Sequence, residues 1–323
     1  MTSAPSLLRP PSVFAIVLNW NGLEDTLRCV ESLGRTSYQP LTVLVVDNGS
    51  RVSPRERLTA AGAAVELIEN PRNLGYAGGN NVGIRIALER GADFVWILNN
   101  DALVEPETLS RLIDTAIRHP TAAAVGGKVL RTDRPATLWA AWGRVTWLQS
   151  LIALVGEDAP DDGRYDGERA VPWIPGCSLL LRSAALRTVG PFDEDFFAYH
   201  EDVEWAARAH AAGWQLWYSG AARTLHAVHG SSGGASHYGG FRKYLSARNS
   251  VLYAKRHGRP WQKALMATAI LTTLPFQFVR RWISGEHRGV VLKLRGWRDG
   301  LRGRPIPLHD LGLDEEAHGD EME

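Results

Sequence analysis

Phe94-Val95-Trp96-Ile97-Leu98-Asn99-Asn100-Asp101 is the stretch that decides how the chain folds. An apolar run that stops at three polar residues is typical of a buried sheet strand where it leaves the core. Open α/β sheets bind their ligands at the carboxyl ends of the strands. The Asp101 carboxylate is therefore placed where it could hold a metal ion or a sugar phosphate. A plain turn is the alternative, because Asn and Asp are also common turn residues.

Two earlier apolar segments end in the same way. Residues 13–18 lead into Asn19-Trp20-Asn21-Gly22, and residues 41–46 lead into Asp47-Asn48-Gly49-Ser50. Strands that alternate with helices predict an α/β fold with a mostly parallel, doubly wound sheet. In such a sheet all three polar strand ends lie along one edge. The other expected elements are strands at 65–69, 123–129 and 214–218 and helices at 23–34, 54–61, 105–119 and 201–212, with a loop at 70–81 that enters a helix ending near residue 90.

Length and composition set the general class of protein. The 323 residues are 45% hydrophobic and 22% charged, and the formal net charge of +1 gives no case for a nucleic-acid partner. The only two cysteines, Cys29 and Cys177, fit a reducing compartment better than a disulfide scaffold. Residues 1–12 form a flexible Pro- and Ser-rich arm without the pattern of a signal peptide. We therefore expect a cytoplasmic protein.

The glycine pattern argues against a dinucleotide-binding domain and favours a nucleotide-sugar site. A dinucleotide-binding loop should follow the first strand, whereas Gly75, Gly78 and Gly79 follow the third. Here Asp47 can accept hydrogen bonds from a base or ribose, and the glycine loop can bring backbone N–H groups close to a phosphate. Asp101 can bind Mg²⁺ or Mn²⁺ through oxygen. The expected donor contacts are Asn19, Asn21, Asp47, Asn48, Gly75, Gly78, Gly79, Asn80, Asn100 and Asp101.

Six motifs occur in an order that resembles the family 2 glycosyltransferases, and most of all their rhamnosyltransferase-like branch. The resemblance covers residues 13–256, and the motifs lie at 17–22, 45–50, 73–81, 98–101, 176–182 and 201–205. It implies a GT-A catalytic domain over 13–230 and an inverting mechanism. It also implies transfer of a sugar, with L-rhamnose from a dTDP donor as the leading candidate, to a lipid-linked or cell-envelope glycan.

The resemblance assigns a metal site with one departure. Asp101 matches the last acid of the D-x-D metal-binding motif, but Asn99 replaces the first acid. His226 matches a position where the family often supplies a further metal ligand, and His229 is a less well aligned competitor. A loop or core histidine is the alternative reading of His226.

The adjacent acids Glu201 and Asp202 match the catalytic-base motif of the family. A sugar hydroxyl is a poor nucleophile until a base takes its proton. Neighbouring positions on a helix point about 100° apart, so only one acid should reach the acceptor, and the family pattern favours Asp202. Acids that complement a helix dipole are the alternative. The expected acceptor contacts are Trp173, Gly176, Tyr199 and Trp205.

Two other classes of function stay open. A sugar nucleotidyltransferase would share this architecture, but it should carry a basic Gly-rich loop after the first strand, where the chain has Asn19-Trp20-Asn21-Gly22. A non-catalytic glycan-binding relative is suggested by Asn99, while Asp101, Glu201 and Asp202 argue against it.

The chain after residue 230 differs in composition. Residues 264–279 carry no charge but are fewer than the ~20 that a membrane-spanning helix needs. Residues 280–304 contain eight Lys or Arg and two acids. We predict a helical, basic region over 231–305 that either touches an anionic membrane surface or packs on the catalytic domain. An acidic, disordered tail is expected over 306–323, and residues 138–169 are expected to form a mobile or acceptor-facing insertion.

Overall fold

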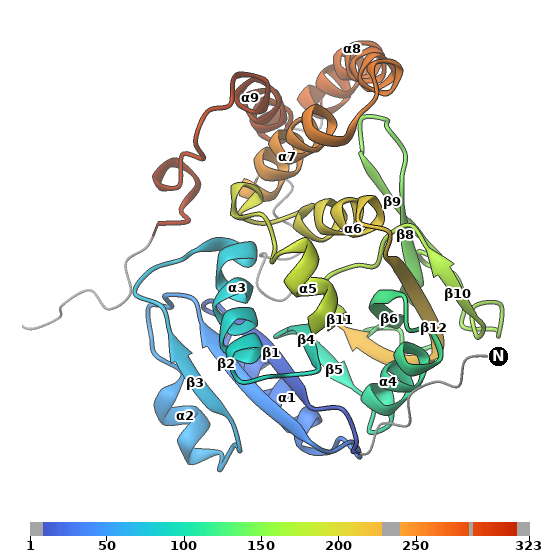
Figure 1. The fold of residues 1–323 in the computed structure, drawn as a ribbon. Coiled ribbons are helices and arrows are strands. Elements are labelled where there is room, and N and C mark those ends of the chain that lie inside the picture. Colours follow the sequence, from blue (N-terminus) through green and yellow to red (C-terminus); the bar gives the residue numbers. More distant parts are fainter. Residues whose placement is uncertain (1–8, 228–239, 284–286, 315–323) are drawn as a thin grey trace, which may run out of the picture.

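A mixed ten-stranded sheet, with helices on both faces, forms the centre of this computed structural model, which describes residues 9–227, 240–283 and 287–314 (Figure 1). The strand order is β10-β12-β6-β11-β4-β1-β2-β3, with β5 paired to β12 and β7 paired to β6. The strands are β1 (Val13–Asn19), β2 (Leu41–Asp47), β3 (Glu66–Glu69), β4 (Phe94–Asn99), β5 (Ala102–Val104), β6 (Ala122–Arg131), β7 (Leu138–Ala140), β8 (Trp142–Val145), β9 (Ile152–Val155), β10 (Glu168–Val171), β11 (Ser178–Arg182) and β12 (Gln215–His226).

The helices divide between the two faces of the sheet and a C-terminal group. The α-helices are α1 (Leu23–Gly34), α2 (Arg55–Ala60), α3 (Gly75–Glu89), α4 (Thr108–Arg118), α5 (Ser183–Val189), α6 (Glu201–Ala211), α7 (Phe241–His257), α8 (Pro260–Ile283) and α9 (His287–Arg302). Two short 3-10 helices lie at Glu194–Phe196 and His309–Leu311.

The parallel half of the sheet confirms the arrangement predicted from the polar strand ends. Strand β1 pairs in parallel with both β2 and β4, and Asn19 lies opposite Asp47 while Leu18 lies opposite Asn99. The three polar strand ends therefore share one edge. Beyond β4 the sheet changes direction, because β11 is antiparallel to both β4 and β6.

Alternate residues of β1 explain why helices cover both faces. Phe14, Ile16 and Leu18 pack with α3, α5 and α6, while Val13 and Val17, with Ala15 between them, pack with α1, α2 and α4. Side chains of a strand point alternately to opposite faces, so a strand buried on both sides needs an unbroken apolar run. Residues 13–18 form such a run.

The structure differs from the predicted elements at four places. Helix α3 begins at Gly75 rather than after the expected loop, because side chains of Asn48 and Asn73 accept the backbone N–H groups of Leu74 and Gly75. The expected insertion at 138–169 forms β7, β8, β9 and the start of β10. Residues 9–12 are anchored through Asp93, and the tail packs inward at Leu313. The rest of the tail, 315–323, lies outside the described residues.

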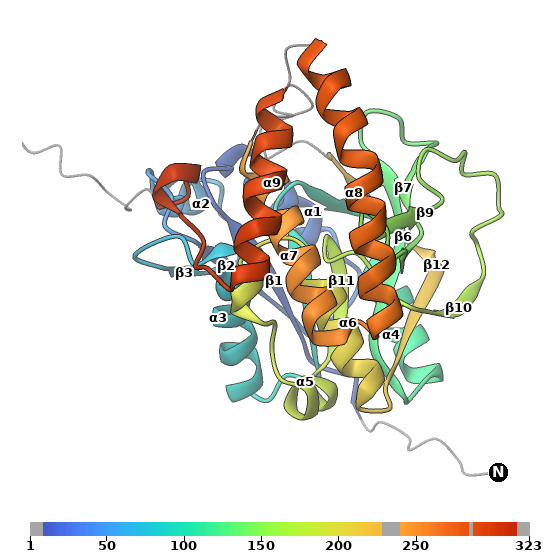
Figure 2. The same ribbon diagram turned by 90° about the horizontal axis from the view of Figure 1, so that it is seen from above.

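Helices α7, α8 and α9 pack together beyond α6, and Figure 2 shows them side by side. Gly296 and Gly300 let α9 approach α7 closely, since a Cβ atom there would lie 2.3 Å from the Tyr244 carbonyl oxygen and 2.7 Å from that of Arg248. Among the described helices, none is long and apolar enough to cross a bilayer. Helix α8 nevertheless exposes several large apolar side chains, including Leu271, Phe276, Trp282 and Ile283.

Candidate active site

A cleft of about 510 Å³ lies at the edge where the parallel strands end. The strand ends, the start of α3 and the segments that lead into β11 and α6 line it on one side. Trp139 and part of the 149–154 segment of the insertion, the first turns of α7, α9 and Leu313 complete the lining. Of the predicted site residues, it brings together Asn48, Gly75, Asn100, Asp101, Trp173, Gly176, Tyr199, Glu201, Asp202 and His226.

The buried pair Asp101 and His226 lies where two neighbouring strands, β5 and β12, pair. Strand β5 begins directly after Asp101 and pairs with the end of β12, with His226 opposite Ala102. This pairing places Nε2 of His226 3.0 Å from Oδ1 of Asp101 and 3.2 Å from Nδ2 of Asn99. The Trp139 ring lies against the imidazole, with 4.8 Å between ring centroids.

Asp101 and His226 supply two of the ligands that a divalent cation needs. A carboxylate oxygen and an imidazole nitrogen meet at one point of the cleft, and carboxylates suit Mg²⁺ and Mn²⁺. In the part of the chain that the structure describes, no group of three or more His, Cys, Asp or Glu side chains could hold a metal. His229, the competing ligand, lies outside the described residues. A metal here would therefore take its other ligands from a substrate, from water or from amide oxygens.

Asp202 lies at the start of α6 with its carboxylate held by two backbone N–H groups. Gly176 N donates to Oδ2 at 2.7 Å, and Val203 N donates to Oδ1 at 2.8 Å. Burial raises the pKa of Asp202 to about 6, while the hydrogen bond from Gly176 acts in the opposite direction. A carboxylate with this pKa is ionised at neutral pH and is close to the strength wanted of a general base.

Glu201 has a different environment although it is the neighbouring residue. It is only 5% exposed, and its Oε2 atom has no hydrogen-bond partner among the described residues. Burial, and then the charge of Asp202, raise the pKa of Glu201 well above its usual value. Burial therefore favours the neutral form of Glu201, while the backbone N–H groups favour the ionised form of Asp202.

The segment before α6 has an unusual backbone. Phe197, Tyr199 and His200 all have φ between 58° and 72°, a region that costs non-glycine residues free energy. The Asn249 side chain of α7 holds this segment, because its Nδ2 atom donates to the carbonyl oxygens of Phe196, Ala198 and Tyr199 at 2.7, 2.9 and 2.7 Å. Asn249 itself is fully buried.

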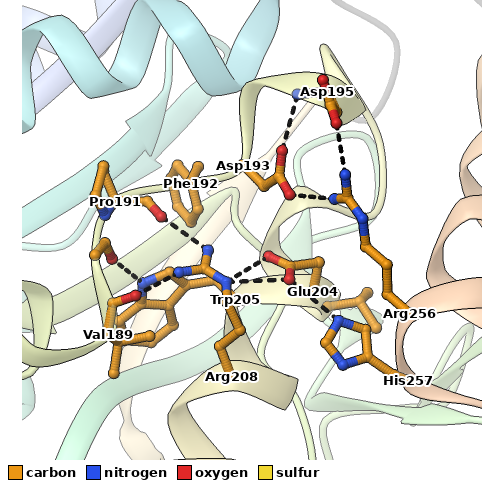
Figure 3. A network of polar contacts seen from close by, with 12 residues as sticks. Val189, Pro191, Phe192, Asp193, Asp195, Glu204, Trp205, Arg208, Arg256 and His257 are labelled. Atoms are coloured by element: carbon orange, nitrogen blue, oxygen red, sulfur yellow. Dashed lines mark hydrogen bonds and ion pairs between the residues drawn. The ribbon is translucent and has the colours of Figure 1, made fainter.

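A polar network on the far side of α6 fixes that helix to its neighbours (Figure 3). Glu204 binds Arg208 through both carboxylate oxygens at 3.0 and 2.8 Å and also contacts His257 of α7 at 3.1 Å. Arg208 in turn donates to the carbonyl oxygens of Val189 and Pro191. Burial raises the pKa of Glu204, but the His257 hydrogen bond and the Arg208 charge outweigh it and lower the pKa overall.

Several predicted donor contacts do not line the cleft. Asp47 is 1% exposed, and its carboxylate accepts from Asn19 Nδ2 at 2.6 Å and from the Ser50 hydroxyl at 2.6 Å. Asn21 points to the Arg51 backbone N–H, which its Oδ1 accepts at 2.9 Å. These side chains brace the loops after β1 and β2.

The glycines of the 73–81 motif serve mainly close packing. A Cβ atom on Gly79 would lie 2.5 Å from Leu18 Cδ1, and one on Gly78 would lie 2.9 Å from Leu74 Cβ. Gly75 has φ of +76° and lines the cleft, whereas Gly78, Gly79 and Asn80 lie inside α3. The N-terminus of α3 is the predicted phosphate contact. Its Ala77 N–H group instead donates to the Phe197 carbonyl oxygen at 2.9 Å.

Three predicted acceptor contacts lie in the cleft and one does not. Trp173, Gly176 and Tyr199 line it. Trp205 is fully buried in the main core and donates its indole N–H to the Gly190 carbonyl oxygen at 2.8 Å. Trp205 therefore belongs to the core and not to the acceptor contacts, because its ring is packed beneath α6 and does not line the cleft.

Sequence reasoning missed several residues that shape the cleft. The Tyr76 hydroxyl lies 3.0 Å from Asn99 Oδ1 and 2.9 Å from the Gly176 carbonyl oxygen, which joins β4 to the loop that holds Asp202. Tyr76 lies inside the 73–81 motif, and this position is the signal in the sequence that could have identified it as a residue of the site. Asn249 follows Arg248 in a pair that also resembles the family, but no local pattern gave its contact with residues 196–199.

Comparisons with known proteins bear on the family and the fold of this chain. A family model described as "Glycosyl transferase family 2" matches residues 14–184. The chain is 30% identical to "N-acetylglucosaminyl-diphospho-decaprenol L-rhamnosyltransferase" of Mycobacterium tuberculosis, over 75% of this chain and 83% of the relative. It is 29% identical to "Galactofuranosyltransferase GlfT1" of the same species, over 60% of this chain and 62% of that one.

A solved structure shares the fold over most of both chains. The mannosyltransferase PcManGT from Pyrobaculum calidifontis, in complex with GDP-Man and Mn²⁺, superposes with a TM-score of 0.57 and 17% identity. The match covers 92% of this chain and 89% of that chain. The expected GT-A fold is confirmed.

Proposed function

The chain belongs to glycosyl transferase family 2, and we propose that it is an inverting enzyme that moves a sugar from a nucleotide-sugar donor to a hydroxyl of a lipid-linked or cell-envelope glycan. The observation that carries this proposal is one cleft that holds an ionised Asp202 and, at the strand ends, the Asp101–His226 pair. A base and a site for a departing phosphate are the two things that such a transfer needs.

Asp202 takes the proton of the acceptor hydroxyl in this mechanism. The oxygen then attacks the anomeric carbon from the face opposite the leaving nucleoside diphosphate, which inverts the configuration. The Gly176 and Val203 N–H groups keep the base oriented. The pKa of Glu201 beside it is raised by burial and by the charge of Asp202, which favours Asp202 as the acid that is charged when the acceptor binds.

Asp101 and His226 are the residues that would hold Mg²⁺ or Mn²⁺. Such a cation offsets the charge of a departing diphosphate. Asn99 stands where a second acid would stand, so this chain offers one carboxylate. The donor itself would contact Asn48, Gly75, Asn100 and Asp101, which line the cleft, and the residues behind them would hold these in place.

L-Rhamnose from dTDP-rhamnose is the donor sugar that we favour. The rhamnosyltransferase relative matches a larger share of the chain than the galactofuranosyltransferase does, which supports this choice. A nucleotidyltransferase is disfavoured because the loop after β1 carries no basic residue. A non-catalytic role is disfavoured because a buried acid with a pKa near 6 lies in the cleft.

Contact with an anionic membrane surface is proposed for α8. Its Leu271 and Phe276 side chains are 72% and 71% exposed, and Arg280 and Arg281 follow on the same helix. An exposed apolar face beside Arg side chains suits a bilayer that contains anionic lipid. Flotation with vesicles that contain anionic lipid should carry the protein upward, and Leu271→Glu/Phe276→Glu should stay in solution. Equal flotation of both would contradict this contact.

The test of the enzymatic proposal is a transfer assay with a panel of dTDP-, UDP- and GDP-sugars and an N-acetylglucosaminyl diphosphate lipid acceptor. We expect one donor to yield a glycosylated lipid of inverted anomeric configuration, with activity lost in EDTA and restored by Mn²⁺ or Mg²⁺. Formation of a sugar nucleotide from a sugar phosphate and a nucleoside triphosphate would contradict the proposal, as would retained configuration or activity unchanged by EDTA.

A further inference from the structure

Three cations from two C-terminal helices line the same cleft as Asp202. Arg242 and Lys243 belong to the first turn of α7, and Lys293 belongs to α9. We refer to Arg242, Lys243 and Lys293 as the cationic cluster. The mechanism above uses none of them. They come from α7 and α9, whereas the donor contacts Asn48, Asn100 and Asp101 stand at the strand ends.

The cationic cluster continues into a second cavity. Lys293 also lines a space of about 450 Å³ between α8 and α9, together with Arg280 and Arg281. Thr272, Thr273 and Gln277 add polar groups to that cavity, and Lys293 Nζ lies 3.5 Å from Gln277 Oε1. The two spaces therefore meet at Lys293, and we refer to the cations and hydroxyl groups that line them beside α8 as one path.

The positive charges lie close enough to affect one another. Burial, and then the charges of Lys293, Arg242 and Arg281, lower the pKa of Lys243 to about 8. Burial, and then the charge of Arg281, lower the pKa of Lys293. Like charges brought together in a half-buried place repel each other, and a bound anion relieves that repulsion. The arrangement suits a ligand with more than one negative charge.

The neighbours of the cationic cluster indicate the rest of the ligand. The Arg242 guanidinium lies 5.6 Å from the centroid of the Tyr199 ring, on the cleft wall that leads to Glu201 and Asp202. At the other end, Phe276 lines the second cavity and is 71% exposed. A ligand that follows this path would place a hydroxyl group at Asp202, an anionic group at the cationic cluster and an apolar chain along α8.

We propose that the cationic cluster binds the diphosphate of a lipid-linked acceptor, which places the acceptor sugar at Asp202 and directs the lipid chain along α8. This inference rests on the proposed function, since it names the chemical class of the acceptor. It assigns separate sites to the donor diphosphate and the acceptor diphosphate, because the donor diphosphate is placed at Asp101.

Binding can be tested apart from catalysis with farnesyl diphosphate as the probe. We expect it to raise the melting temperature of the wild-type chain, and farnesol to raise it less. Arg242→Gln/Lys243→Gln/Lys293→Gln should lose the response to farnesyl diphosphate but keep the response to the nucleotide sugar. Lys263→Gln is the matched control, because Lys263 is an exposed cation of α8 that lines neither cavity. An unchanged response of the triple variant would overturn the proposal.

Transfer to two matched acceptors gives a second readout. Both carry N-acetylglucosamine, one on a prenyl diphosphate and the other on a neutral octyl chain. Because a charge-assisted hydrogen bond is commonly worth about tenfold in affinity, the triple variant should raise KM for the diphosphate acceptor at least ~10-fold. Its KM for the neutral acceptor and for the donor should stay unchanged. Should the triple variant not fold, Lys243→Gln and Lys293→Gln are measured singly against the same two acceptors.

The alternative outcomes separate the two proposals. A higher donor KM would assign the cationic cluster to the donor and overturn the inference, and so would an equal loss with both acceptors. If the wild-type chain transfers sugar to neither acceptor, the proposed function fails. The response to farnesyl diphosphate then still decides whether the cationic cluster is a diphosphate site.

Discussion

The floor and the wall of the cleft are built in opposite ways. The floor, made of the ends of β1, β2 and β4, ties its polar side chains to one another, as Asn19, Asp47 and Ser50 do. The wall, residues 196–202, has residues with positive φ and buried acids with raised pKa values. Satisfied polar groups stabilise a fold, whereas strained and incompletely paired ones mark the place where chemistry occurs.

Asp101 is the exception on the floor, and replacing it should have the largest effect of any change to the floor. Asp101→Asn removes the negative charge that faces His226. A bound metal stabilises the transition state by several kcal/mol, so weaker metal binding should lower kcat/KM about 100- to 1,000-fold. Steady-state kinetics over a Mn²⁺ titration would check this. A kcat/KM that stays near the wild-type value at every Mn²⁺ concentration would show that Asp101 belongs with the scaffold of the floor.

Asn249→Ala should damage the wall without changing the floor. It removes the three hydrogen bonds that hold the backbone of residues 196–199, so the base should be misplaced. A displacement of about 1 Å can cost up to ~100-fold in rate, and we expect kcat to fall ~10- to 100-fold with the donor KM unchanged. Ser250→Ala is a suitable control, because the Ser250 hydroxyl donates to the Ala247 carbonyl oxygen of the same helix. If both variants lose kcat equally, Asn249 acts through helix stability alone.

The pH dependence of the reaction reports on the wall. The pKa of Asp202 is raised to about 6, and the base works only when it is ionised. The rate kcat/KM should therefore be constant at neutral pH and fall about tenfold per pH unit below ~6. Profiles for the wild type and for the floor variant Asp47→Asn should show the same midpoint. A rate that is flat down to pH 4.5 would contradict the assignment of the base.

Asp47→Asn should mainly affect stability, which makes it the mildest test of the comparison. The change replaces an acceptor of the Asn19 amide and the Ser50 hydroxyl with a group that can also donate. We expect the free energy of unfolding to fall by about 1–3 kcal/mol, the usual cost of a disrupted buried hydrogen bond. The kcat of the folded variant should stay within a few-fold of wild type. Denaturant unfolding with parallel kinetics would measure both, and a kcat loss as large as that of Asp101→Asn would contradict the scaffold role.

The sequence predicted the floor well because its signals are local. Unbroken apolar runs at residues 13–18 and 94–98 give buried strands, and the polar residues after them mark the shared edge. The motif order also predicted the family and the GT-A fold, both of which are confirmed. It could not show that Asp47 is fully engaged inside the floor, since that depends on distances between three loops.

The wall was less predictable because its contacts join distant parts of the chain. Asn249 lies about fifty residues after the carbonyl groups that it holds. The start of α3 at Gly75 depends on side chains of Asn48 and Asn73, which compete with the simple expectation of a glycine loop. The basic C-terminal region is predicted either to touch a membrane surface or to pack on the catalytic domain, but its composition could not show that Lys243 and Lys293 line the cleft.

The most direct test of the account is the comparison of Asp202→Asn with Glu201→Gln in one transfer assay. We predict that Asp202→Asn lowers kcat/KM by about 100- to 10,000-fold, the usual contribution of a general base, while it remains folded and still binds the donor. Glu201→Gln should stay within about tenfold of wild type, because burial raises the pKa of Glu201 and so favours the neutral form that Gln resembles. Near wild-type turnover of Asp202→Asn, or a larger loss in Glu201→Gln, would contradict the assignment of Asp202 as the base.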